Sequence, residues 1–426
     1  MKRITVTNAK DDAAKLRSSS NYVTDDLIEK VKSIMDNVAK YGDSAIINYV
    51  EKFDSVKVNS LKVTEEEVKQ AYRNVTTRQI QSVNLIKERL MKTEMSLFKK
   101  LKGITVSFDG VTIKRVIQPI SNIGCYIPGG KARYPSTMIM CAIPAKVVGV
   151  KRIVAVSPPM KDGMIDSLTL VAADICGVNE FYKMGGAHAI SALTFGTSSI
   201  NKVDKIVGPG GLFVTIAKIL VSGKISVDMV AGPTELLIYA DSNADARLIA
   251  VDLISQSEHS SDTLCGLVTT SKELALHVSN NIQALIANGI ERDEIVRKSL
   301  ESRGFIAICN DEPTAIDFIN EIAPEHLEIM VRSTKNITKK IRSAGLILTG
   351  KYTPSSASDY CLGSNHVLPT LGFSRSKASL SILDFIKVVN VVKSSKVGLQ
   401  KIETDVKEIT SAEGLINHYE AIKERI

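Results

Sequence analysis

The chain has 426 residues, of which 44% are hydrophobic, so it is long enough to form two or more domains, each with its own buried core. Its net charge is +8, but the Lys and Arg residues are scattered, and 5% aromatic content without Trp argues against a nucleic-acid-binding surface. No stretch is apolar enough to span a membrane and the first residues lack the apolar run of a secretory leader, so we expect a cytoplasmic protein.

Residues 24–100 are predicted to be helical. Thr24 can cap a helix whose apolar residues recur at helical spacing until about Gly42. Thr64-Glu65-Glu66-Glu67 is a capping box, which predicts the start of a second helix. On either side of Asp109-Gly110, residues 104–108 and 111–117 alternate in polarity, so this segment is expected to form a β-hairpin.

From about residue 123 to 350 the pattern changes to short apolar strands that alternate with helical segments, which is typical of α/β folds with parallel sheets. There are enough strands for two sheets, with breaks near Cys125 and Glu235. Farther on, residues 379–392 are β-rich and residues 411–426 helical, which suggests an appended tail. The expected strands are Arg152–Ser157, Val203–Val207, Glu235–Ala240, Leu264–Thr269, Phe305–Cys309 and Leu346–Thr349.

The glycine clusters give weak evidence for a nucleotide site. No Gly-x-Gly-x-x-Gly motif follows a strand; Pro128-Gly129-Gly130 and Gly185-Gly186 are short clusters. Gly208-Pro209-Gly210-Gly211 lies between an expected strand and an expected helix, where free backbone N–H groups favour phosphate. A tight turn that needs positive φ explains the same glycines about equally well.

Four of the six histidines have a carboxylate or amide a few residues away in the sequence, namely His259, His326, His366 and His418. Imidazole and carboxylate groups both bind borderline metal ions and transfer protons near neutral pH, so the pattern suggests a metal-assisted proton-transfer site. The six cysteines include no Cys-x-x-Cys pair, which argues against a disulfide framework and a thiolate cage. Any metal is therefore expected to use nitrogen and oxygen ligands.

The sequence around these histidines gives evidence of different strength for a functional site. Gln256 and His259 are three residues apart on a helix that Asn243 could cap, so their side chains share a face, although such a pair on a surface helix is more often inert. Glu325-His326 follows Pro324, which predicts a short turn or helix start. Asp359 and His366 lie in a loop after the strand at 346–349, where open α/β sheets place ligands.

Several blocks in the right order resemble the histidinol dehydrogenase family from about residue 20 to the C-terminus. They are Gly124-Cys125-Tyr126-Ile127-Pro128-Gly129-Gly130, Ala142-Ile143-Pro144-Ala145-Lys146, Val207-Gly208-Pro209-Gly210, Ala231-Gly232-Pro233-Thr234-Glu235, Asp252-Leu253 to His259, Ala323 to Leu327, Asn365-His366-Val367-Leu368-Pro369-Thr370, and Glu413-Gly414-Leu415 with His418. The resemblance implies zinc-dependent oxidation of L-histidinol through the aldehyde to L-histidine with two NAD, at the end of histidine biosynthesis.

The resemblance also implies a role for individual residues. The metal ligands fall on Gln256, His259, Asp359 and His418, and the catalytic proton acceptors on Glu325 and His326. Substrate binding falls on Thr234, His366 and Glu413 as well as on the metal ligands and His326, and NAD contacts on Tyr126, His188 and Gly211. The implied assembly is a homodimer in which His418 completes the zinc site of the other subunit.

The expected architecture is α/β, with two Rossmann-like parallel-sheet domains, an N-terminal helical segment and a C-terminal tail exchanged between subunits. We expect an N-terminal arm over 1–23, a discontinuous first domain over 24–125 and 236–380, an NAD-binding domain over 126–235, and a tail over 381–426. His188 and Gly211 replace the Gln and Asn that the family usually has, so a lost side-chain hydrogen bond would weaken NAD binding by about 0.5–1.5 kcal/mol.

Three alternatives stay open on the sequence. The chain could use the same metal and cofactor to oxidise another hydroxy compound, as relatives of the family do. It could also be a basic nucleic-acid-binding protein, which is the less favoured class. Cys125 could trap an aldehyde as a thiohemiacetal, but no histidine or run of cations adjoins it, so a buried structural thiol is preferred. His277 lies in a helical pattern and is expected to be a surface or packed histidine.

Overall fold

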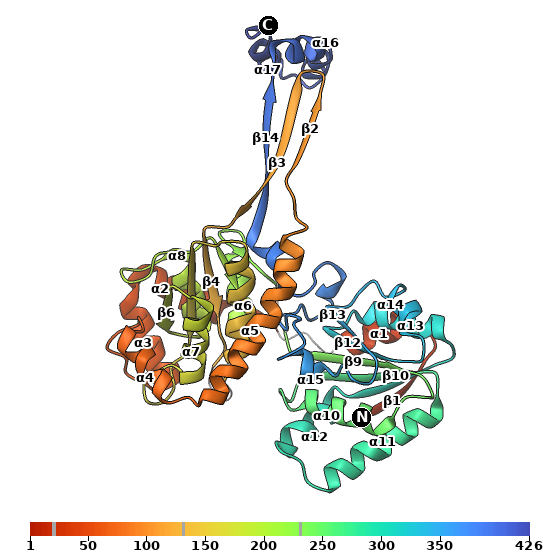
Figure 1. Ribbon diagram of the computed structural model, residues 1–426. Coiled ribbons are helices and arrows are strands. Elements are labelled where there is room, and N and C mark those ends of the chain that lie inside the picture. The colour runs from red at the N-terminus through yellow and green to blue at the C-terminus, as the bar shows by residue number, and fades with distance from the viewer. Residues whose placement is uncertain (19–22, 130–132, 230–231) are drawn as a thin grey trace.

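The computed structural model describes residues 1–426 except 19–22, 130–132 and 230–231, so Gly130 and Ala231 of the motifs above lie outside the described residues. It contains two parallel β-sheets flanked by helices, which confirms the α/β class (Figure 1). The six-stranded sheet has the order β1 (Lys2–Val6), β11 (Phe305–Cys309), β10 (Leu264–Thr269), β9 (Glu235–Ala240), β12 (His326–Met330) and β13 (Leu346–Thr349).

The second sheet has five parallel strands, in the order β6 (Glu180–Lys183), β5 (Arg152–Ser157), β4 (Asn122–Tyr126), β7 (Lys205–Val207) and β8 (Ser226–Val227). All six predicted strands are present, and only β7 begins later than predicted. The strands β1, β4, β6, β8 and β12 were not predicted. In β1 and β12, charged and polar residues such as Lys2, His326 and Glu328 interrupt the apolar pattern. The expectation of a turn or helix start at Glu325-His326 was wrong, since His326 opens β12.

The helices between residues 24 and 98 form as predicted. Thr24 caps α2 (Asp25–Tyr41), which ends at Gly42, and Thr64 and Glu67 form the capping box of α4 (Glu65–Arg73). Together with α3 (Asp43–Asp54) and α5 (Thr77–Phe98), these helices pack against α6 (Pro135–Val147), α7 (Ser167–Cys176), α8 (Gly186–Phe195) and α9 (Leu212–Val221).

This packing differs from the predicted grouping of residues 24–125 with 236–380. The apolar faces of α2 to α5 share hydrophobic clusters with the five-stranded sheet, whereas residues 236–341 form clusters with the N-terminal segment. The N-terminal segment is also more than an arm, because β1 is an edge strand of the six-stranded sheet and α1 (Ala9–Ser18) packs on α13 (Glu312–Ile322).

The remaining helices of this half are α10 (Ala246–Ser257), α11 (Lys272–Ala287), α12 (Asp293–Ser302), α14 (Thr334–Thr338) and α15 (Ser355–Ser358). Asp245, not Asn243, caps α10: its carboxylate accepts hydrogen bonds from the backbone N–H groups of Arg247 and Leu248. The predicted cap was therefore two residues too early, although both residue types suit that position. His277 lies on α11 and is exposed.

A long arm projects from the two sheets (Figure 1). Its stem is an antiparallel sheet of β2 (Ile104–Phe108), β3 (Val111–Pro119) and β14 (Ile386–Ser394), and its tip carries α16 (Lys396–Ala412) and α17 (Ile416–Lys423). Asp109 and Gly110 both have positive φ, as the predicted two-residue hairpin turn requires. None of the described helices is both long and apolar enough to cross a membrane.

Candidate active site

The candidate site is a cavity of about 330 Å³ between the two parallel sheets. On one side, Pro128 and Gly210 follow the carboxyl ends of β4 and β7, the usual position for ligands of open α/β sheets. On the other side, Thr234 and His326 stand at the amino ends of β9 and β12. The predicted residues that line this cavity are Gly211, Thr234, Gln256, His259, Glu325, His326, Asp359 and His366.

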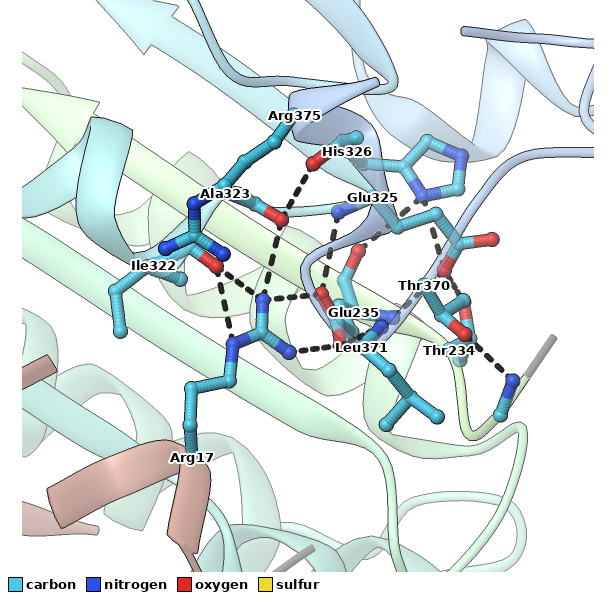
Figure 2. A network of polar contacts seen from close by, with 12 residues as sticks. Arg17, Thr234, Glu235, Ile322, Ala323, Glu325, His326, Thr370, Leu371 and Arg375 are labelled. Carbon is cyan, nitrogen blue, oxygen red and sulfur yellow. Dashed lines mark hydrogen bonds and ion pairs between the residues drawn. The ribbon is translucent and has the colours of Figure 1, made fainter. Parts of the chain in front are cut away.

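Glu325 is held by a chain of hydrogen bonds at the base of the cavity (Figure 2). Its Oε2 accepts from the Thr234 hydroxyl at 2.6 Å and from the Glu235 backbone N–H at 2.7 Å. The Gln256 side-chain amide in turn donates to the Thr234 hydroxyl at 2.9 Å. Glu325 is 6% exposed, so these donors replace the water that its carboxylate would otherwise bind.

His326 lies beside Glu325 and is buried. Its Nδ1 is 3.3 Å from the Glu235 carbonyl oxygen and 3.6 Å from Glu325 Oε2, and its Nε2 is 3.4 Å from Asp359 Oδ1. Burial alone would lower the pKa of His326, but the carboxylates of Glu325 and Asp359 outweigh it and raise this pKa to about 10. The imidazole is therefore protonated at neutral pH as long as no cation offsets those two charges.

Asp359 and His366 come from the loop after α15, as predicted. The Asp359 carbonyl oxygen is 2.6 Å from His366 Nδ1, and the Thr137 hydroxyl is 3.1 Å from His366 Nε2. The Asn365 side chain donates to the Met140 carbonyl at 2.9 Å, which anchors the loop to α6. Although burial opposes ionisation, the imidazole of His326 keeps the pKa of the Asp359 carboxyl below its usual value.

The side chains around this cavity are of the types that bind a borderline divalent ion, but one chain brings too few of them together to hold it. Asp359 Oδ1 is a buried oxygen with no hydrogen-bond partner among the described residues, and it shares the cavity with the exposed imidazole of His259 and the buried amide of Gln256. Imidazole nitrogen and carboxylate oxygen are standard zinc ligands. Within the described part of the chain, however, no three His, Cys, Asp or Glu side chains are grouped closely enough to hold a metal.

The Gly208–Gly211 turn closes the opposite wall of the cavity. Gly208 has a φ of 112°, and a Cβ there would lie 2.1 Å from the Tyr126 carbonyl oxygen, so this turn requires glycine. Asp228 accepts the Gly208 N–H at 2.7 Å, and buried Lys218 donates to the Gly208 carbonyl at 2.8 Å and pairs with Asp228. Gly208 thus occupies a tight turn with positive φ, while Gly211 caps the N-terminus of α9 at the cavity wall, where a phosphate would be favoured. The two explanations of this glycine cluster do not exclude each other.

Four of the predicted residues lie elsewhere. Tyr126 and His188 are buried in the five-stranded half, where the Tyr126 hydroxyl accepts the Gly186 N–H at 3.0 Å and burial raises its pKa to about 12. His188 stacks against two aromatic rings of α3. Glu413 and His418 are exposed at the tip of the arm, far from the cavity of their own chain (Figure 1).

The sequence model of the histidinol dehydrogenase family matches residues 17–426. The chain belongs to this family. Its relatives include histidinol dehydrogenases of Methanocaldococcus jannaschii, 40% identical over 96% of this chain and 94% of the relative, and of Clostridium acetobutylicum, 43% identical over 94% and 92%. The crystal structure of histidinol dehydrogenase from Elizabethkingia anophelis covers 100% of this chain and 98% of its own, with 33% identity and a TM-score of 0.94.

Membership makes the chain an oxidoreductase of histidine biosynthesis and explains the order of the sequence blocks. The structure adds residues that the sequence analysis did not single out, above all Arg17 and the side chain of Glu235, which bond to each other next to Glu325. Glu235 stands inside a quoted motif, but Arg17 is one arginine in a charged helix and carries no pattern that could have singled it out.

Proposed function

We propose that this enzyme oxidises L-histidinol through the aldehyde to L-histidine, with zinc and two molecules of NAD. The observation that carries the proposal is the single cavity in which Glu325 and His326 meet Thr234, Gln256, His259, Asp359 and His366. It brings two groups suited to proton transfer within reach of nitrogen and oxygen donors for a metal.

In the first oxidation, the hydroxyl of histidinol must lose its proton as the carbinol carbon loses a hydride. His326 Nδ1, when protonated, donates to the Glu235 carbonyl, which leaves Nε2 as the acceptor. NAD, when bound, accepts the hydride. A zinc ion held by His259, Asp359 and the Gln256 amide would supply a positive charge that attracts nitrogen donors of the substrate and offsets the Asp359 carboxylate. A neutral His326 can then accept the hydroxyl proton.

The second oxidation starts from the aldehyde and consumes one water molecule. Glu325 is suited to take the proton from that water, because Thr234 and Glu235 fix its carboxylate beside His326 and both of their donors bind the same oxygen, Oε2. The hydrate would then lose a hydride to the second NAD and a further proton to solvent, and the product would leave as the carboxylate. The two adjacent groups thereby divide the two proton transfers between them.

The metal site is proposed to need two chains. One chain offers His259, Asp359 and the Gln256 amide at the cavity, while its own His418 lies at the tip of the arm. His418 of the partner subunit would complete the set, and Glu413 on the same tip would bind substrate. The exposed apolar side chains of the arm, Val106, Phe108, Val388 and Val391, agree with an arm that packs against a second copy.

The NAD site is proposed to lie along the carboxyl ends of β4 and β7. The first turn of α9, which Gly211 caps, offers backbone N–H groups to a phosphate. Tyr126 and His188 are buried in the same half, where the Tyr126 hydroxyl accepts the Gly186 N–H and His188 lies on α8. Tyr126 and His188 do not line the described cavity that Gly211 lines, and the resemblance to the family is what assigns them to NAD.

The deciding experiment is metal-dependent NAD reduction with L-histidinol, compared with a panel of other amino and hydroxy alcohols. We expect two NADH per histidinol, loss of the signal with a chelator and recovery with zinc. His326→Ala should lower turnover about 10²- to 10⁴-fold while zinc stays bound. A preference for another alcohol, or full turnover by the His326→Ala variant, would contradict the proposal.

A further inference from the structure

Arg17, at the end of helix α1, is partly buried next to Glu235 and the residues that lead into Glu325 and His326 (Figure 2). Its side chain is 16% exposed and that of its partner Glu235 is 3% exposed. The guanidinium forms a fork on the Glu235 carboxylate, with Nη2 2.9 Å from Oε2 and Nη1 bonded to Oε1. Such a two-point contact fixes orientation as well as charge.

The same guanidinium also binds the end of α13, the helix that leads into the catalytic pair. Nε donates to the Ile322 carbonyl at 3.0 Å and Nη2 to the Ala323 carbonyl at 3.1 Å. Ala323 has a left-handed φ of 49°, and only Pro324 separates it from Glu325. Arg17 therefore binds the last carbonyls of α13, where a cation is favourable, and restrains the backbone that enters the site.

Glu235 passes this restraint to the catalytic pair through both its side chain and its backbone. Its Oε2 accepts the Glu325 N–H at 3.3 Å, while its own N–H donates to Glu325 Oε2 at 2.7 Å and its carbonyl oxygen is 3.3 Å from His326 Nδ1. Its Oε1 also accepts the Leu371 N–H at 2.9 Å. Without Arg17, this carboxylate would be a buried charge without its cation at the point where all of these bonds meet.

We propose that Arg17 is a positioning residue, which sets the geometry of Glu325 and His326 through Glu235 and the end of α13. The inference rests on the proposed function for the identity of the reaction. It gives the N-terminal segment a task in catalysis, because α1 must be docked on α13 for the pair to be in place.

The test compares Arg17→Met and Arg17→Lys with Arg375→Met. Arg375 is a matched control, since it also binds the end of α13, through the Glu321 carbonyl and carboxylate, but does not contact Glu235 in the described structure. Arg17→Met should lower kcat about 100-fold, the cost of a misplaced catalytic group, and leave KM for histidinol within about threefold. Arg17→Lys should recover part of kcat, and Arg375→Met should match the wild type within about twofold.

Zinc per subunit should be equal in all three variants, because the proposed ligands do not contact Arg17. Combining Arg17→Met with Glu235→Gln should cost less than the product of the two single losses, since the second change removes the unpaired charge. Circular dichroism checks folding, and if Arg17→Met does not fold, Arg17→Lys and Glu235→Gln carry the comparison.

A kcat for Arg17→Met within about twofold of the wild type would overturn the inference, as would an equal loss in Arg375→Met. An inactive wild type would instead contradict the proposed function. In that case, nuclear magnetic resonance of the ¹⁵N-labelled His326 ring tests the inference separately. The ring signals should shift in Arg17→Met and stay in place in Arg375→Met. Unchanged signals in both variants would overturn the inference.

Discussion

His188 should make the stability of this enzyme depend on pH in a way that His188→Gln removes. The ring is 2% exposed, and neither of its nitrogens has a hydrogen-bond partner among the described residues. Burial therefore lowers the pKa of His188 from 6.5 to about 4. Between these values the unfolded chain binds a proton that the folded chain does not, so the free energy of unfolding falls as the pH is lowered.

The size of the effect follows from the shift. A difference of about 2.5 pH units, at roughly 1.36 kcal/mol per unit, corresponds to ~3 kcal/mol that is present above pH 6.5 and lost by about pH 4. Glutamine has no charge to gain in this pH range. The difference in the free energy of unfolding between the wild type and His188→Gln should therefore change by ~3 kcal/mol across this pH range.

The assay is urea unfolding at a series of pH values, followed by far-ultraviolet circular dichroism on metal-free protein, so that loss of metal in acid does not contribute. His277→Gln is the matched control, because His277 is exposed on α11 and its replacement should leave the pH dependence unchanged. Curves for wild type and His188→Gln that stay parallel within about 0.5 kcal/mol would refute the reasoning.

Four further predictions concern the site and its surroundings. Coexpressed His326→Ala and His418→Ala subunits should recover about a quarter of wild-type activity if each site uses residues of both subunits. Half of the dimers are then mixed, and each mixed dimer has one intact site out of two. No recovery would contradict shared sites. Asp359→Asn should weaken zinc binding more than about tenfold, measured as metal retained after dialysis. Gly211→Asn should tighten NAD binding by about 0.5–1.5 kcal/mol in calorimetry, since nothing lies within 4 Å of a Cβ there and φ is ordinary. Cys125→Ser should keep most turnover, because Cys125 lies on β4 with its side chain fully buried in the core; a thousandfold loss with zinc bound would contradict that.

The sequence was sufficient for most of the architecture because its signals are local. The caps at Thr24 and Thr64, the Asp109-Gly110 turn and the apolar strands depend only on neighbouring residues, and each is present. The grouping of segments was predicted less well, because which sheet the helices of 24–98 cover depends on contacts with α6 to α9, which are distant in the sequence. Lys2 and Arg3 hid the edge strand β1 for a simpler reason, since one side of an edge strand tolerates charge.

The site shows the same division between local and distant information. Gln256 and His259 do line one cavity, but the prediction that one helix carries both was wrong, because α10 ends at Ser257. On spacing alone, an inert surface pair was the favoured interpretation. The strand-end rule was applied to the loop after residues 346–349, and Asp359 and His366 of that loop do line the cavity. It gave no hint of Thr234 and His326, which stand at the amino ends of β9 and β12. Only the resemblance to the family assigned a role to Glu325, because a Pro-Glu-His sequence has no local signature of catalysis.

The polar groups behind the cavity explain how the hydrogen-bonding needs of the Glu325 carboxylate are met although it is almost buried. Glu325 draws on the Thr234 hydroxyl and the Glu235 N–H, and Glu235 is in turn neutralised by Arg17. Removing any one of these leaves a buried donor or charge without a partner, which costs more than the bond itself contributes. The precision of the pair at 325–326 therefore depends on a helix that begins at residue 9, more than three hundred residues earlier in the chain.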